Sequence, residues 1–234
     1  MSADDIKKKI DTVGNIKVIF EPAVYSENRI LKKNLQDILE KSRVSLRGWS
    51  FPHIPNEDRD ETVRPYSIVN GIEFYTTWNQ FIEIFRLYQS GQFLAKFALY
   101  EDTIGEAYGK QLKPGQYLDF LGLIYKITEI VLFIKNLIEN TDIERGKLVV
   151  EINKTRNREL NSIFSPSIIP LSPGCICRIE PVTAIGEFNR EKTMADCLEI
   201  GRSILKSIFD DFNWQHYSDQ MIKTHQENLV NRRI

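Results

Sequence analysis

The chain has 234 residues, which is enough for one large domain or two small ones and for a sizeable buried core. Its 31 basic and 32 acidic side chains leave a net charge of −1, a balance that argues against a strongly basic nucleic-acid-binding protein. The three cysteines are an odd number in a chain too large to need disulfides, which favours reduced thiols in the cytoplasm. No apolar run follows the charged first ten residues, so the pattern predicts no signal peptide.

The first part of the chain is predicted to alternate short helices and strands. Apolar side chains recur at helical spacing over 27–41, which predicts a helix with Ser26 as its N-cap. The other elements expected here are a polar helix at 3–12, strands at 16–20 and 43–47, and a charged loop at 54–64.

The middle of the chain contains the clearest turn signal. The dipeptide at Asn70 and Gly71 predicts a hairpin over 66–75. The sequence TWNQ at 77–80 then matches a capping box, which predicts a helix over 78–89 that ends before a glycine. A strand at 92–100 and a polar loop at 101–115 are expected to follow.

A densely apolar segment, 117–138, has about the length of a membrane span. A charge at the centre of a bilayer costs about 2.5–3.5 kcal/mol on insertion scales, and this segment carries several. On a helix five of its polar or small residues fall on one narrow stripe, a pattern typical of a central core helix. We therefore expect no association with a membrane. The stripe consists of Asp119, Gly122, Lys126, Glu129 and Asn136.

The last part of the chain mixes strands and helices without a regular β-α-β alternation. We expect a single α+β domain, residues 1–234, with an antiparallel or mixed sheet of about five to seven strands covered by helices, including one long central core helix. The elements expected here are strands at 147–154 and 175–182, an irregular stretch at 155–173, and helices at 190–212 and 218–232.

The common catalytic and cofactor motifs are missing. The glycines are scattered, so neither a phosphate-binding loop nor a nucleophile elbow is predicted. Cys175 and Cys177 are closer together than zinc ligands usually are, and the histidines form no matching pairs. The sequence therefore predicts no cofactor and no metal site. One alternative is a metal-dependent hydrolase or nuclease that would use Glu101, Asp102 or Glu151.

The most functional-looking segment is 43–53, a predicted strand that ends in an aromatic corner. Arg47 beside Trp49 would present a cation and a ring together, and aromatic and arginine side chains dominate protein interfaces. The predicted binding set joins this corner to the end of the helix expected at 78–89. Its members are Arg47, Trp49, Phe51, His53, Arg86, Tyr88, Gln89 and Gln92.

Two segments, RGWSFPHI at 47–54 and RLYQSGQF at 86–93, together resemble a family of uncharacterised bacterial conserved proteins. The similarity extends through Thr128 and Glu129 and to the run NRR at 231–233. The resemblance implies a bacterial cytoplasmic protein. It also implies that the two aromatic segments belong to one shared surface, and it assigns no catalytic residue.

Three functional hypotheses follow. The first is a non-enzymatic binding or adaptor protein that recognises a protein partner through the corner, with self-association left open. The second is nucleic-acid binding, which salt-dependent affinity would reveal; the third is the metal-dependent hydrolase. In the purely structural alternative, Trp49 and Phe51 are core residues, and Arg47 and Arg86 pair with buried carboxylates. The cations of the second hypothesis are Arg29, Lys32, Lys33, Arg43 and Arg47.

Overall fold

The computed structural model describes residues 2–54, 65–78, 80–164 and 174–233, and its centre is one large sheet. In these ranges the sheet has seven strands, each antiparallel to its neighbours, in the order β13-β11-β1-β7-β6-β5-β4. The strands are β1 (Asn15–Pro22), β4 (Tyr66–Ile68), β5 (Gly71–Trp78), β6 (Phe81–Tyr88), β7 (Phe93–Ala98), β11 (Arg145–Asn153) and β13 (Val182–Asn189).

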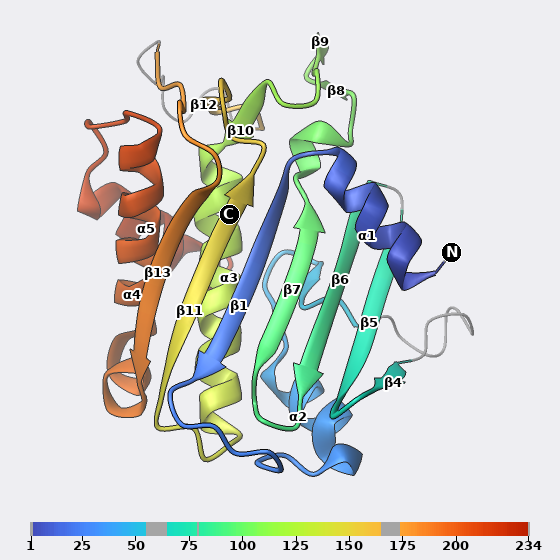
Figure 1. Ribbon diagram of the computed structural model, residues 1–234. Coiled ribbons are helices and arrows are strands. Elements are labelled where there is room, and N and C mark those ends of the chain that lie inside the picture. The colour runs from blue at the N-terminus through green and yellow to red at the C-terminus, as the bar shows by residue number, and fades with distance from the viewer. Residues whose placement is uncertain (1, 55–64, 79, 165–173, 234) are drawn as a thin grey trace.

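Helices cover one face of the sheet almost completely and the other face only in part. Figure 1 shows α2, α3 and α4 behind the sheet, while α1 crosses in front of β6 and β7. Helix α5 packs on α3 and α4. The helices are α1 (Ala3–Thr12), α2 (Leu35–Ser42), α3 (Phe120–Glu139), α4 (Arg190–Asp211) and α5 (Asp219–Val230).

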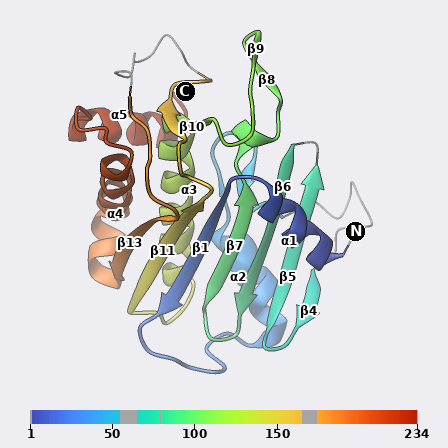
Figure 2. The same ribbon diagram turned by 45° about the horizontal axis from the view of Figure 1, so that its top comes forward.

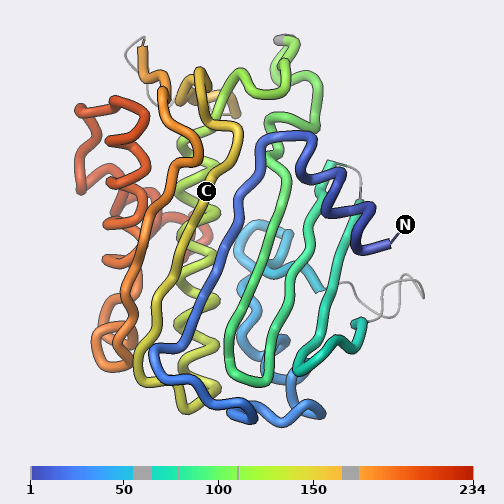
Figure 3. Tube along the Cα trace, viewed as in Figure 1, coloured from blue at the N-terminus to red at the C-terminus, as the bar shows by residue number. Residues whose placement is uncertain are grey.

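Short elements fill the two ends of the sheet. Figure 2 shows β8, β9 and β10 together above one end, and in Figure 3 the segment between β1 and α2 passes beneath the other. The short elements there are the strand pairs β8 (Glu106–Ala107) with β9 (Lys110–Gln111) and β10 (Tyr117–Asp119) with β12 (Glu159–Asn161), and the 3-10 turns η1 (Lys32–Asn34) and η2 (Tyr100–Asp102). A further pair, β2 (Val44–Ser45) with β3 (Ser50–Phe51), packs on α3.

The two faces of the sheet differ because side chains alternate along each strand. On β1, Val18 belongs to the core shared with the helices, whereas Lys17 and Ile19 lie on the opposite face. The register places Val18 between Ala95 of β7 and Val150 of β11, so the helix-facing side is apolar across neighbouring strands.

Helix α3 is the central helix, with α2, α4 and α5 packed around it. Asp119 caps its first turn by accepting a hydrogen bond from the Gly122 amide at 2.7 Å. Ile127, Ile130 and Ile134 are completely buried. The predicted α+β fold, with a sheet of about five to seven strands and a long core helix, is confirmed; the described sheet is antiparallel and has seven strands. Within the described ranges, no helix combines the length and apolar character that crossing a membrane requires.

A buried ion pair ties several loops together at one end of the sheet. Both carboxylate oxygens of Asp102 accept hydrogen bonds at 2.8 Å from Arg158, which follows β11 and has no solvent exposure. Asp102 also accepts the backbone N–H groups of Gly14 at 2.7 Å and Gly115 at 2.9 Å, and Arg158 donates to the Tyr117 carbonyl. Burial alone would raise the pKa of Asp102, but Arg158 and the two amides hold it below its usual value.

The helix predicted at 27–41 begins later than expected. Turn η1 is followed by α2, which starts at Leu35. The Ile30 amide donates to the carbonyl of Gln89 at 2.8 Å, so the residues before η1 lie against the β6–β7 turn instead of coiling. Ser26 is therefore not a helix N-cap.

The helix predicted at 78–89 is wrong, because β5 ends at Trp78 and Phe81–Tyr88 form strand β6. Phe85 and Leu87 face the main core, and Ile82 and Ile84 are buried on the other face beneath α1. A strand that is apolar on both faces loses the two-residue alternation that would identify it.

The strand predicted at 175–182 is also wrong. In the described ranges this segment makes one isolated bridge, between Ile176 and Glu159, and β13 begins at Val182. Pro181 lacks the N–H that would continue a ladder across this point. Most of the loop expected at 54–64 and residues 165–173 lie outside the described ranges. The elements expected at 3–12, 16–20, 66–75, 92–100, 147–154, 190–212 and 218–232 are present within a few residues.

Arg158→Met should lower the free energy of unfolding by about 3–5 kcal/mol, because it leaves the Asp102 carboxylate buried without its partner. Urea denaturation at pH 7 would measure the loss. Arg156→Met, two residues away and exposed, is the matched control and should change stability by less than about 0.5 kcal/mol. Equal stability of the two variants would show that the buried pair does not hold the fold together.

Candidate functional site

The predicted corner is a tight hairpin between α2 and the sheet. Val44 pairs with Phe51 and Ser45 with Ser50, so the strand expected at 43–47 is only two residues long. Gly48 turns the chain with φ of +78°, in the left-handed region that glycine adopts readily.

Arg47 fastens the corner to helix α3. Its Nε and Nη2 atoms donate to the two carboxylate oxygens of Glu129 at 2.9 and 2.8 Å. The side chain of Glu129 is 1% exposed, so this bidentate pair neutralises a buried carboxylate. The guanidinium also lies 5.4 Å from the ring centre of Tyr125.

Trp49 fastens the same corner to strand β6. Its indole N–H donates to Glu83 at 3.3 Å, and its ring stacks on His53 at 3.7 Å and on Phe81 at 4.4 Å between centroids. Burial, with Arg43 and Lys126 nearby, lowers the pKa of His53 to about 4, so the imidazole is neutral at pH 7. Phe51 lies in the core, where its ring meets three other phenylalanine rings edge-on.

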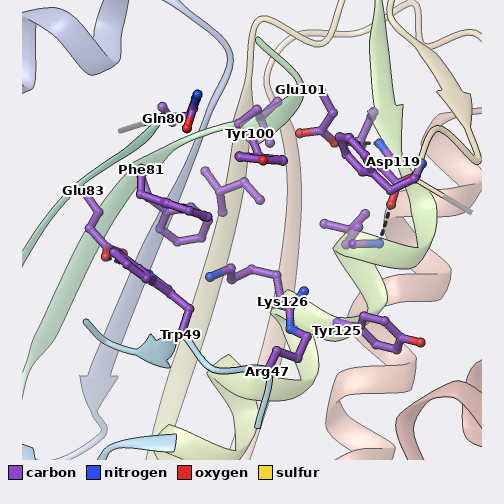
Figure 4. Close-up of a pocket in the computed structure, with 18 of the residues that line it drawn as sticks. Arg47, Trp49, Gln80, Phe81, Glu83, Tyr100, Glu101, Asp119, Tyr125 and Lys126 are labelled. Atoms are coloured by element: carbon purple, nitrogen blue, oxygen red, sulfur yellow. Dashed lines mark hydrogen bonds between the residues drawn. The ribbon is translucent and has the colours of Figure 1, made fainter. Parts of the chain in front are cut away.

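A pocket of about 430 Å³ lies between the corner, strands β6 and β7, and the start of α3 (Figure 4). One side, which we call the aromatic wall, consists of Trp49, Phe81, Tyr100 and Phe164. Successive ring centroids along it are 4.4, 5.2 and 5.4 Å apart. Trp49, Phe81 and Tyr100 stack nearly parallel, so their faces lie mostly against one another and their edges give the pocket an apolar side for a hydrophobic molecule.

The opposite side of the pocket is the polar stripe of α3 that the sequence reveals. Asp119, Gly122 and Lys126 line the pocket, and Glu129, one turn further on, binds Arg47. Asp119 is not available to a ligand, because one oxygen caps the helix and the other accepts the amides of Ile163 and Phe164. Burial raises its pKa, and these amide hydrogen bonds counteract part of that effect.

Lys126 is the charged side chain of the pocket that makes no hydrogen bond within the described ranges. Its side chain is 19% exposed, and Nζ lies 5.0 and 5.4 Å from the ring centres of Phe97 and Phe51. Its ion pair with Glu129 is long, at 3.8 Å. In the described part of the chain no acceptor lies within hydrogen-bonding distance of this ammonium.

Two buried carboxyl groups flank the pocket, and the pKa of each is raised to about 7. For Glu83 the cause is burial, which the neighbouring Lys126 and the Trp49 indole offset in part. For Glu101 burial again dominates, against the Asp119 amide that it accepts at 2.7 Å. Both groups therefore change protonation near neutral pH.

The structure does not bring the second half of the predicted binding set to this pocket. Alternation along β6 puts Arg86 and Tyr88 on the face of the sheet opposite Glu83. Arg86 pairs there with the buried carboxylate of Glu73. In the turn after β6, Gln89 donates to Asn28 and Gln92 donates to Glu21.

The cations of the nucleic-acid hypothesis are also dispersed. Arg29 is 6% exposed and binds Asp142 and two backbone carbonyls, and Arg47 is occupied by Glu129. Lys32 reaches the Ile68 carbonyl at 3.3 Å. The two remaining side chains, Lys33 and Arg43, are exposed.

The three acids of the metal hypothesis lie apart in different environments. Asp102 is bound by Arg158, and Glu101 accepts the Asp119 amide. Glu151 lies on the other face of the sheet, 3.8 Å from Lys17. In the described ranges, no group of three or more histidine, cysteine, aspartate or glutamate side chains could hold a metal ion.

Sequence reasoning missed several pocket residues. The stripe on α3 was visible in the sequence and contains Lys126, but helical periodicity indicated only a core helix. The position of Glu83 in the pocket could not be predicted, because the pattern predicts a helix where β6 lies. Glu101 was named only as a metal ligand, and Phe81 and Tyr100 carried no signal of their own.

Comparison of the chain with models of protein families, with curated proteins and with solved structures gives no match.

Glu83→Gln should change how stability depends on pH. The pKa of Glu83 in the folded protein is about 7, above its ordinary value, so its contribution is complete at low pH and is lost as the pH rises through 7. Between pH 5 and pH 7.5 the variant should lose less unfolding free energy than the wild type, by on the order of 2 kcal/mol. Urea denaturation at both pH values measures this difference. The exposed Glu187→Gln is the control, and identical pH dependence of all three proteins would contradict the prediction.

Proposed function

We propose that the protein is a binding protein whose ligand is a small organic molecule held in the pocket beside the Arg47–Trp49 corner. The observation that carries this proposal is the pocket itself, about 430 Å³ in volume, in which an aromatic wall faces a helix that presents charged groups. Sites for small molecules typically combine an apolar, aromatic lining with a few placed polar groups.

The arrangement favours a small ligand over a protein partner at the corner. Arg47 remains exposed, but its guanidinium is bound by Glu129, and the half-buried Trp49 is bound to Glu83, so both side chains are already engaged within the chain. The same contacts fix the shape of the pocket before a ligand arrives, which reduces the entropic cost of binding.

A binding protein is the first hypothesis from the sequence, but the proposed ligand is a small organic molecule instead of a protein partner. The nucleic-acid alternative has less support, because Arg29 and Arg47 are both neutralised by carboxylates of the chain. Binding to a phosphate backbone requires a solvent-exposed basic face, and these two arginines would not contribute free charge to it.

The fluorescent probe 8-anilinonaphthalene-1-sulfonate, an aromatic molecule that brightens in apolar sites, should bind the wild type saturably at one site. Phe81→Ala removes the ring between Trp49 and Tyr100 and should weaken this binding about 2- to 10-fold, since stacked ring contacts contribute about 0.5–1.5 kcal/mol. A fluorescence titration measures both dissociation constants.

Tyr25→Ala is the matched control, because Tyr25 is an aromatic residue 76% exposed in the loop after β1. It should leave probe binding unchanged, and the urea midpoints of both variants show whether they are folded. Equal binding by wild type and folded Phe81→Ala, or no saturable binding by the wild type, would refute the pocket as a ligand site.

A further inference from the structure

We propose that the ligand is a small dipolar aromatic molecule, with an anionic group bound at Lys126 and a cationic or N–H-donating group bound at Glu101. This inference rests on the proposed function and names the chemical class of its ligand. Its basis is the separation of charge in the pocket. In Figure 4, Lys126 extends from α3 towards Phe81 and Trp49, whereas Glu101 lies near the other end of the aromatic wall, beside Tyr100.

Lys126 has the features of an anion-binding group. Glu129, the nearest carboxylate, receives two hydrogen bonds from Arg47, and Lys126 is left with a 3.8 Å ion pair. A partly buried ammonium loses hydration, and the described residues place no acceptor within hydrogen-bonding distance to replace it. A ligand carboxylate at Nζ would supply a charge-assisted hydrogen bond there.

Glu101 has the complementary features. One of its oxygens accepts the Asp119 amide, and the carboxylate of Asp119 lies close enough to raise its pKa further. Arg158 is the nearby cation, but its guanidinium is committed to both oxygens of Asp102. A positively charged group on the ligand would balance a buried acid that the chain leaves without a cation of its own.

A ligand with one charge fits the pocket less well. An anion would satisfy Lys126 but would place its charge near Glu101 and Asp119. A cation would satisfy Glu101 but would meet Lys126 and Arg47. A molecule that carries both charges on a flat body places its anion at Lys126 and its cation at Glu101, and covers the aromatic wall between them. The anion then lies beside the buried Glu83 and the Glu129 that Arg47 neutralises.

The test uses probes that differ only in charge. The dipolar probes are 3- and 4-(aminomethyl)benzoate, which separate the two charges by different distances. The matched single-charge probes are 4-methylbenzoate and 4-methylbenzylamine. Isothermal titration calorimetry at pH 8, above the pKa of Glu101, measures the affinity of each for the full chain.

At least one dipolar probe should bind the wild type at least about tenfold more tightly than either single-charge probe, because each charge-assisted hydrogen bond contributes about 1.5–3 kcal/mol. Lys126→Met keeps an unbranched side chain, one atom shorter, but removes its charge, and should bring the dipolar probe close to 4-methylbenzylamine in affinity. Glu101→Gln keeps an acceptor for the Asp119 amide and should bring it close to 4-methylbenzoate.

The exposed residues Lys113 and Glu106 provide matched controls, and Lys113→Met and Glu106→Gln should bind every probe as the wild type does. Urea midpoints establish that all variants are folded, and the comparison of probes on the wild type does not depend on any variant. A single-charge probe that binds as tightly as both dipolar probes would overturn the proposal. So would a failure of all four probes to bind, and in that case saturable binding of 8-anilinonaphthalene-1-sulfonate would leave the proposed function intact.

Discussion

The buried pair between Asp102 and Arg158 is the interaction on which the pocket depends. It draws together the entry to β1, the turn η2, the approach to α3 and the turn after β11. Glu101 precedes Asp102 directly, so the bond that fixes Asp102 in the core also fixes Glu101 against the first turn of α3. The room for this junction is limited, because a Cβ on Gly14 would lie 2.2 Å from the Arg158 guanidinium. One end of the pocket is thus set by a structural ion pair that itself takes no ligand.

The fold class and the central helix could be predicted from the sequence. A strand that is buried on both faces could not. Helix α3 was identifiable because its polar residues occupy one stripe of an otherwise apolar helix. The same reasoning mistook β6 for a helix, since Ile82 and Ile84 are buried under α1 while Phe85 and Leu87 face the main core. Local periodicity cannot show that α1 covers the second face of β6, because α1 is about seventy residues away in the chain.

Of the candidate site, the sequence predicted only the residues of the 43–53 corner and not their partners. Arg47 and Trp49 stand out by composition, but their partners Glu129 and Glu83 are 82 and 34 residues away. Contacts at such separations are determined by the arrangement of the sheet and helices, not by the sequence around either residue. The predicted extension to Arg86 rested on the resemblance, which implies one shared surface, and on a helix at 78–89, but Arg86 lies on the face of the sheet opposite the pocket. An error in one element thereby moved half of the predicted binding set.

The charges in the pocket neutralise one another only in part: Lys126 lies near Glu129 and Glu83 without a hydrogen bond to either, and Arg158 acts on Glu101 only from a distance. Arg47 uses both oxygens of Glu129, which leaves Lys126 with a distant partner, and Arg158 uses both oxygens of Asp102, which leaves Glu101 without a paired cation. Partly buried groups in this condition destabilise a fold, and a chain selected for stability alone would pair or replace them. Bidentate arginine pairs at both ends keep the neighbouring charge only partly compensated within a preformed aromatic pocket. That cost is offset if a ligand supplies the two missing counter-charges.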